Sequence, residues 1–110
     1  MAEKVKILTN DNFKDEVLNS DGVVLIDFHA SWCRPCKALS GSIDELGTEF
    51  DGRATICKAD VEENSDVVGC LGINAVPTIL IYKSGGLLER FTGMRSKSDL
   101  KSDLEKAIDE

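Results

Sequence analysis

The sequence predicts an α/β fold in which a mixed central β-sheet carries helices on both faces. Three observations support this class: strand-like and helix-like segments alternate along the chain, one strand-like run is apolar at nearly every position, and two later runs are joined by a glycine-rich turn. The chain has 110 residues, of which 42% are hydrophobic and 30% charged, as in an ordinary globular domain. We therefore expect residues 1–110 to form a single domain.

The first half of the chain contains two strand-like and two helix-like segments. Val5–Leu8 is typical of a short strand, and Val23–His29 is typical of a strand covered on both faces. Between them, residues 11–19 are typical of a helix that buries Phe13, Val17 and Leu18. The clearest helix follows the second strand, because its apolar residues recur every three or four positions: Cys36, Leu39, Ile43, Leu46 and Phe50.

The second half continues the alternation and ends in a hairpin and a helix. Residues 54–61 form the next expected strand, and Ser65–Leu71 a short helix that stops at Gly72. Strands separated by helices are expected to run parallel. Residues 78–83 and 87–92 are expected to pair across a glycine-rich turn and to add antiparallel edge strands. A last helix begins near Ser96 and turns four apolar side chains inward: Leu100, Leu104, Ala107 and Ile108.

Charge and hydropathy exclude several classes of partner. The net charge of −7 argues against a nucleic-acid partner, because phosphate binding needs clustered cations. No apolar run approaches the ~20 residues of a membrane helix. The first ten residues lack the apolar core of a signal peptide, so we expect a cytoplasmic protein that does not engage membranes. In that compartment its four cysteines are expected to serve redox or metal chemistry rather than a disulfide framework.

Cys33 and Cys36 stand at the junction of the apolar strand and the clearest helix. If Cys33 is the N-cap, Arg34, Pro35 and Cys36 occupy the first three helical positions. Pro35 has no amide hydrogen and suits the first turn, so the amide of Cys36 is left to hold the Cys33 sulfur. A helix N-terminus favours a thiolate and thereby lowers the pKa of a thiol placed there. We expect Cys33 to be the exposed attacking thiol and Cys36 the buried resolving thiol.

A metal site is the alternative use of these two cysteines. Zinc requires about four ligands. The remaining candidates, Cys57, Cys70 and His29, form no second pair with ligand spacing. We therefore expect redox chemistry, with no metal and no bound cofactor.

Several separated motifs resemble the thioredoxin family. The segment from Trp32 to Lys37 reads WCRPCK and follows Asp27-Phe28, and Val76-Pro77-Thr78 comes later. The resemblance covers almost the whole chain, from the first helix to the last. It implies a thioredoxin fold and a thiol–disulfide oxidoreductase that reduces protein disulfides.

The resemblance also implies roles for two charged residues. In the family, the aspartate matching Asp27 lies beneath the site and moves a proton to or from the resolving thiol, and burial raises its pKa toward a useful range. The alternative is a polar residue at a solvated strand end. Lys58 matches a lysine that lies near that aspartate. The alternative for Lys58 is that it is an exposed lysine at a strand end without a role in the site.

A second group of residues is implied to bind the target. Pro77 matches a cis-proline that faces the two cysteines in the family. Targets lay an extended segment beside this proline, so the backbone of Val76 is expected to pair with a substrate strand. Trp32, Gly93 and the edge at residues 75–76 are expected to form the apolar contact surface.

The implied reaction begins with attack of the Cys33 thiolate on a disulfide-containing target protein. Cys36 then attacks Cys33 and releases the reduced target, and a thioredoxin reductase reduces the pair again. We expect the protein to act as a monomer. Two other functions stay open from the sequence: a more oxidising oxidant or isomerase, and a thioredoxin-like module that binds partners without redox chemistry.

The sequence departs from the family pattern at three positions near the site. Arg34 replaces a glycine, and its guanidinium is expected to stabilise the Cys33 thiolate and make the pair more oxidising; the alternative is a solvated arginine that selects acidic partners. His29 replaces a tryptophan, either as a half-buried packing residue or as a titratable partner of Asp60 or Asp27. Gly41 replaces a helix proline, which puts the usual kink in doubt.

The two remaining cysteines are expected to differ in exposure. Cys57 lies in the middle of a strand and is expected to be an inert core residue. Cys70 lies off the apolar face of its short helix, so we expect partial exposure and leave a regulatory thiol as the minority interpretation.

Overall fold

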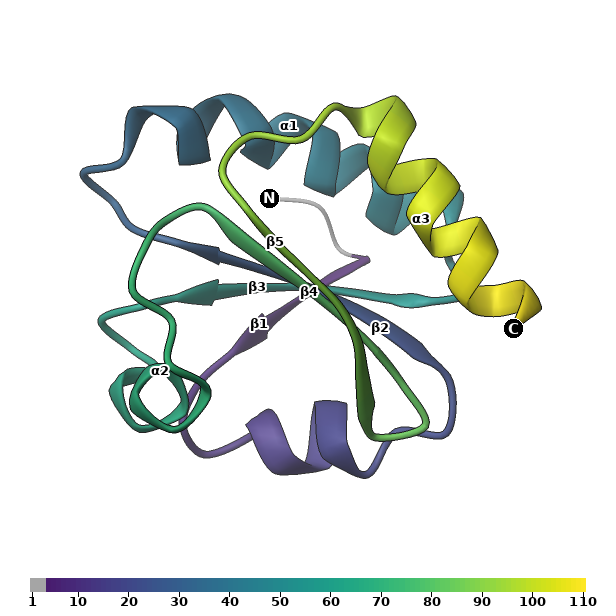
Figure 1. The fold of residues 1–110 in the computed structure, drawn as a ribbon, viewed down its shortest axis with the longest axis horizontal. Coiled ribbons are helices and arrows are strands. Elements are labelled where there is room, and N and C mark those ends of the chain that lie inside the picture. Colours follow the sequence, from purple (N-terminus) through teal and green to yellow (C-terminus); the bar gives the residue numbers. More distant parts are fainter. Residues whose placement is uncertain (1–3) are drawn as a thin grey trace.

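A computed structural model describes residues 4–110. Within this part of the chain, strands and helices alternate as the sequence predicts (Figure 1). The elements are β1 (Val5–Leu8), η1 (Lys14–Leu18, a π-helical turn), β2 (Val23–His29), α1 (Arg34–Glu49), β3 (Thr55–Asp60), α2 (Ser65–Leu71), β4 (Thr78–Lys83), β5 (Gly86–Thr92) and α3 (Lys97–Asp109). The expectation that residues 1–110 form a single domain stays a prediction, and its first three residues lie outside the described part.

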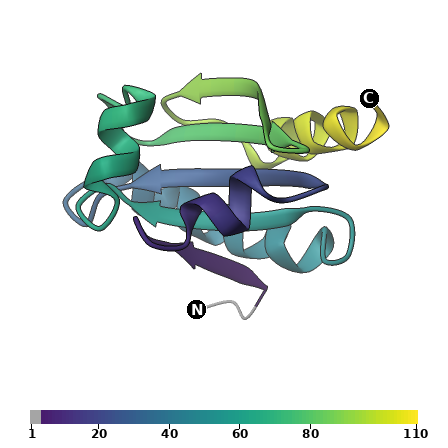
Figure 2. The same cartoon turned by 90° about the horizontal axis from the view of Figure 1, so that it is seen from below.

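The five strands form one mixed sheet in the order β1-β3-β2-β4-β5, which Figure 2 shows edge to edge. β1, β3 and β2 run parallel, whereas β4 and β5 are antiparallel to their neighbours. β2 therefore lies at the centre of the sheet. Its burial on both faces explains its nearly continuous apolar sequence.

The position of β4 corrects one expectation. We expected residues 78–83 and 87–92 to add antiparallel edge strands, and β4 is antiparallel to β2, but it lies inside the sheet rather than at its edge. Figure 1 shows α2 close to the ends of β2 and β3, on the side of the sheet opposite α1 and α3. The chain consequently re-enters the sheet from the end at which β3 left it, and a parallel crossover is not made.

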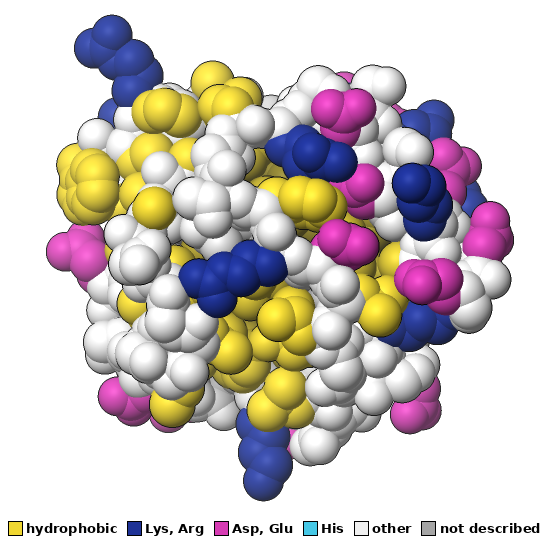
Figure 3. All heavy atoms as spheres, viewed as in Figure 1, with side chains coloured by type: hydrophobic (Ala, Val, Ile, Leu, Met, Phe, Trp, Pro, Cys, Tyr) yellow, Lys and Arg dark blue, Asp and Glu magenta, His cyan; other side chains and the backbone are white. Residues whose placement is uncertain are grey.

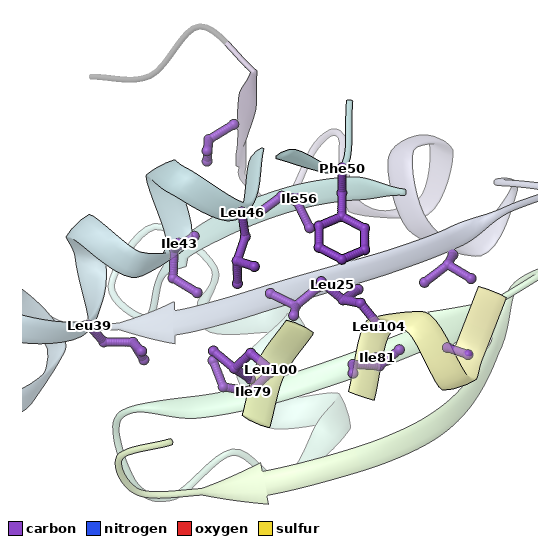
Figure 4. Packing of buried hydrophobic residues seen from close by; sticks show 13 residues of the cluster. Leu25, Leu39, Ile43, Leu46, Phe50, Ile56, Ile79, Ile81, Leu100 and Leu104 are labelled. Atoms are coloured by element: carbon purple, nitrogen blue, oxygen red, sulfur yellow. The ribbon is translucent and has the colours of Figure 1, made fainter. Parts of the chain in front are cut away.

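Helices cover both faces of the sheet, as predicted. One core lies beneath α1 and α3 and includes the apolar stripe of α1 together with Leu100 and Leu104 of α3 (Figure 4). The second core lies on the opposite face, where Phe13 and Val17 pack against the sheet beside Val67 of α2. β2 contributes alternate residues to the two cores, which fixes the face on which each of its side chains lies.

The first helical segment is the least accurate of the predictions. It is a five-residue turn, Lys14–Leu18, instead of a helix over residues 11–19. Phe13 and Val17 are buried as predicted, but the prediction for Leu18 is wrong because this side chain is 43% exposed. So short a turn presents only a narrow stripe to the sheet, and Leu18 falls outside it. The other elements start and end within one residue or so of the expected positions.

No helix among residues 4–110 is both long enough and apolar enough to cross a membrane.

Candidate active site

Cys33 caps the N-terminus of α1. Its backbone is extended, and its Sγ accepts a hydrogen bond from the amide of Cys36 over 3.3 Å, as the sequence predicted. Pro35 lies in the first turn, where it forfeits no hydrogen bond. Cys33 and Cys36 are joined by a disulfide with their Cα atoms 5.3 Å apart, so the structure describes the oxidised form.

The expected difference in exposure between the two cysteines is absent in this form. Cys33 is 5% exposed and Cys36 is 3% exposed, so the prediction that Cys33 is an exposed thiol is wrong for the disulfide. The capping geometry turns the Cys33 sulfur back over the helix, and Val61 and Val76 pack against the pair. A target must therefore approach through the surface that these two valines border.

Asp27 is a buried carboxyl group in β2, on the face covered by α1. It is 1% exposed, and neither of its oxygens has a hydrogen-bond partner among residues 4–110. Desolvation raises the pKa of Asp27 to about 7, although the positive charge of Lys58 acts in the opposite direction. The expectation of a buried aspartate is confirmed, and a solvated strand end is excluded.

Lys58 pairs in register with Asp27 on β3, but its ammonium group turns to α1. Its Nζ donates to Ser40 Oγ over 2.6 Å and to Asp44 Oδ1 over 2.8 Å. Lys58 is buried, which excludes the alternative of an exposed strand-end lysine. Sequence reasoning missed Ser40 and Asp44, although their spacing of four residues on one helix was a usable signal.

The loop before β4 carries the expected cis peptide bond, between Val76 and Pro77. The amide of Gly93 donates to the carbonyl of Pro77 over 2.8 Å, which ties the segment after β5 to this loop. Arg90 of β5 holds the other end of the loop, because its guanidinium donates to the carbonyls of Leu71 and Gly72 over 2.8 Å each. This second contact was not predicted from the sequence.

An apolar groove borders this loop. It has a volume of about 230 Å³ and is lined mainly by apolar side chains, among them Trp32, Val61, Ile73 and Val76. Trp32 is 72% exposed, which excludes a core role for it. Hydrophobic side chains gather at the surface near the start of α1, at the upper left of Figure 3. The arrangement is a buried disulfide beside an open apolar surface.

Comparison with known proteins agrees with this geometry. The thioredoxin family model matches residues 4–106. The chain is 40% identical over 108 residues to thioredoxin 2 of Chlorobaculum tepidum, an alignment that covers 98% of this chain and 99% of that protein. It is 34% identical over 108 residues to the thioredoxin of Pseudomonas aeruginosa, covering 98% of this chain and all of that protein.

The chain belongs to the thioredoxin family. Thioredoxins are thiol–disulfide oxidoreductases, and the Cys33–Cys36 pair gives this chain the same activity, the reduction of protein disulfides by dithiol–disulfide exchange. Its substrates are therefore disulfide-containing proteins, and members of the family usually work with a reductase. The two alternatives that the sequence left open are not favoured.

The three departures from the thioredoxin pattern have different structural settings. Arg34 is exposed at the first position of α1. His29 is half-buried at the end of β2, where burial lowers its pKa and the neighbouring charge of Asp60 opposes that shift. Gly41 is exposed within α1, which continues through it from Arg34 to Glu49.

The two other cysteines lie away from the pair and are free thiols. Cys57 is fully buried in β3, which confirms the expected core position, and burial raises its pKa to about 12. Cys70 is exposed on α2. Among residues 4–110, no group of three or more His, Cys, Asp or Glu side chains is arranged to hold a metal ion.

Proposed function

We propose that Cys33 is the nucleophile of the exchange and Cys36 the resolving thiol. The observation that carries this assignment is the hydrogen bond from the Cys36 amide to the Cys33 sulfur at the start of α1. In the reduced protein the same amide and the positive end of the helix dipole stabilise a thiolate on Cys33. A thiolate attacks a target disulfide, forms a mixed disulfide, and releases the first target sulfur as a thiolate.

Asp27 serves the second half of the reaction. Cys36 loses its proton to the Asp27 carboxylate, and the Cys36 sulfur then attacks Cys33 and expels the second target sulfur. Two electrons pass to the target, which takes up two protons overall. Both groups are buried, Asp27 in β2 and Cys36 in the first turn of α1, and the pKa of Asp27 is about 7, which supports this transfer near neutral pH. Lys58 assists by placing a positive charge near Asp27.

The target lies across the apolar groove as an extended strand. Among residues 4–110, the backbone of Val76 makes no hydrogen bond, which leaves its amide and carbonyl free to pair with a target. Pro77 and Gly93 hold the neighbouring backbone in place through their mutual hydrogen bond. Trp32 supplies an exposed aromatic surface beside the pair.

Arg34 and Pro35 tune the reactive sulfur. Pro35 leaves the Cys36 amide as the donor to Cys33, and the exposed Arg34 adds a positive charge next to the thiolate. A thiolate stabilised in this way stabilises the reduced form, so Arg34 makes the pair more oxidising.

The electron donor, location and oligomeric state extend the same proposal. A thioredoxin reductase restores the dithiol, no bound cofactor takes part, and the protein works as a monomer in the cytoplasm. The family membership supports the reductase. The two free thiols, Cys57 and Cys70, support a reducing compartment.

A trapping experiment tests the assignment of the two cysteines. In a Cys70→Ser background, the Cys36→Ser variant is expected to accumulate a mixed disulfide with an oxidised target such as insulin. The Cys33→Ser variant is expected to trap none. Turnover with thioredoxin reductase and its reductant is expected only when both cysteines are present. Equal trapping by the two variants would contradict the assignment.

A further inference from the structure

The ammonium group of Lys58 has two partners on α1 and none on β2. Asp27 and Lys58 occupy paired positions in neighbouring parallel strands and lie on the face beneath α1. The Lys58 amine nevertheless bonds to Ser40 and Asp44, and it forms its ion pair with Asp44 at 2.8 Å. Asp27 is left without a hydrogen bond from any residue in 4–110.

The position of that amine matters because it is the charge that acts on Asp27. Desolvation raises the pKa of Asp27, and the Lys58 charge lowers it. A direct contact between an ammonium and a buried carboxylate stabilises the ionised form by far more than a distant charge does. An amine that is held on α1 and neutralised by Asp44 leaves Asp27 able to accept and release a proton near neutral pH.

We propose that Ser40 and Asp44 are positioning residues, which hold the Lys58 ammonium on α1 and thereby keep Asp27 competent to exchange a proton with Cys36. The inference rests on the proposed role of Asp27 in the reaction. It assigns a function to two helix residues through their contacts with Lys58. Neither is a catalytic residue, because neither touches the reacting sulfurs.

Apolar side chains and several charged groups surround Asp27 and Lys58 on the neighbouring elements. On β4, the residue in register with Asp27 is Ile79, and α3 presents Leu100 and Leu104 to this core. Charged and titratable groups approach from the remaining sides: His29 on β2, Asp60 at the end of β3, Lys37 on α1 and Glu63 in the following loop. With Cys36, Ser40 and Lys58 they line a groove of about 440 Å³, which gives solvent access to the Lys58 side of the site.

The proton balance is simple. The carboxylate of Asp27 takes the proton of Cys36 as the Cys36 sulfur attacks Cys33, and the S–S bond to the target breaks. The proton then leaves Asp27 for the released target thiolate or for solvent. A tightly ion-paired Asp27 would hold its negative charge too firmly to accept this proton.

The test is a pH titration of the Asp27 carboxyl carbon by NMR in the intact oxidised protein. In Asp44→Asn the pKa of Asp27 is expected to fall by roughly 0.5–1 unit, because the freed ammonium can approach the carboxylate. Ser40→Ala is expected to shift it in the same direction by a smaller amount. Glu45→Gln removes a carboxylate from the same helix that pairs with Lys97 instead, and it is expected to leave Asp27 unchanged.

A double variant separates positioning from a general effect on the helix. In a Lys58→Met background, Asp44→Asn is expected to shift the pKa of Asp27 by less than half as much. An unchanged or raised pKa in both folded single variants, or an equal shift without Lys58, would overturn the proposal. If Asp44→Asn fails to fold, the titration of Ser40→Ala alone tests the proposal.

The pH profile of target reduction distinguishes this proposal from the proposed role of Asp27. If Asp44 positions Lys58 and Asp27 accepts the proton of Cys36, the midpoint of the pH profile of activity in Asp44→Asn falls together with the pKa of Asp27. If the carboxyl pKa moves but the activity profile does not, the positioning stands and the catalytic role of Asp27 falls.

Discussion

The backbone of Gly85 lies directly against the carbonyl oxygen of Leu18, so that a Cβ at position 85 would overlap this oxygen. The contact joins the β4–β5 turn to the end of η1. Gly85 also has a φ of +81°, which side chains disfavour. We predict that Gly85→Ala destabilises the protein by more than about 2 kcal/mol, from strain plus displacement of η1. Urea unfolding measures this loss.

Gly52→Ala is the matched control for Gly85→Ala. Its φ of +85° is nearly the same, but a Cβ there meets no atom of residues 4–110 within 4 Å apart from its own chain neighbours. Gly52→Ala is expected to lower the free energy of unfolding by about 1–2 kcal/mol, from backbone strain alone. Equal losses of stability in the two variants would show that the contact with Leu18 does not contribute to the effect of Gly85→Ala.

Burial of Asp27 predicts an unusual pH dependence of stability. Its pKa is raised from 3.8 to about 7 in the folded state, so the folded protein binds the proton more tightly than the unfolded chain does. The contribution of Asp27 to the free energy of unfolding is therefore highest below about pH 4, and it falls as the pH rises to about 7. Asp27→Asn removes the cost of burying an ionised carboxylate. The variant is therefore expected to be more stable than the parent protein at pH 8, by up to about 4 kcal/mol.

The comparison at low pH checks the cause of that difference. At pH 4 the Asp27 carboxyl is protonated in the folded protein and no charge is buried, so the advantage of Asp27→Asn is expected to shrink strongly. Substitution of an exposed carboxylate, Asp109→Asn, is expected to show no such pH dependence. A stability difference that is the same at pH 4 and pH 8 would contradict ionisation as its source.

Local patterns were enough to predict most of the fold. The apolar run of β2, the three-to-four spacing along α1 and the glycine turn before β5 each specify an element through its own residues. The position of β4 inside the sheet could not be predicted in this way, because it depends on which strand the chain pairs with after α2. The exposure of Leu18 depends likewise on how few residues η1 contributes to the core.

The two free cysteines are predicted to react very differently. Cys70 is exposed, whereas Cys57 is fully buried with its pKa raised to about 12. Treatment of the oxidised native protein with iodoacetamide at pH 8 is expected to add one label, on Cys70, as measured by mass spectrometry. Cys70→Ser is expected to take up none and also to lose any oxidative dimerisation. Labelling of Cys57 without denaturant would contradict the packing of β3.

Arg34 is predicted to raise the reduction potential of the pair. Arg34→Gly removes a positive charge beside the Cys33 thiolate and destabilises the reduced form, so the potential is expected to fall by roughly 10–20 mV. Arg34→Lys keeps the charge and is expected to stay close to the parent value. Equilibration with a glutathione buffer measures both. An unchanged or higher potential in Arg34→Gly would leave Arg34 only a role in partner selection.

Some features of the site can be predicted from the sequence, and others cannot. The capping of Cys33 by the Cys36 amide follows from the identities of four consecutive residues, and the structure contains it. The contacts of Lys58 with Ser40 and Asp44 join residues that are 18 and 14 positions apart in the sequence, and they depend on side-chain direction. Burial of Cys33 in the disulfide form depends on packing by Val76 from a distant loop.

The most direct test of the account is the ionisation of Cys33 in the reduced protein. Cys57 and Cys70 are replaced by serine, and the rate of alkylation is followed as a function of pH. If the start of α1 stabilises the thiolate, Cys33 reacts readily with a midpoint clearly below the ~8.5 of a free cysteine. A midpoint equal to that of free cysteine, or a sulfur that does not react, would contradict the account.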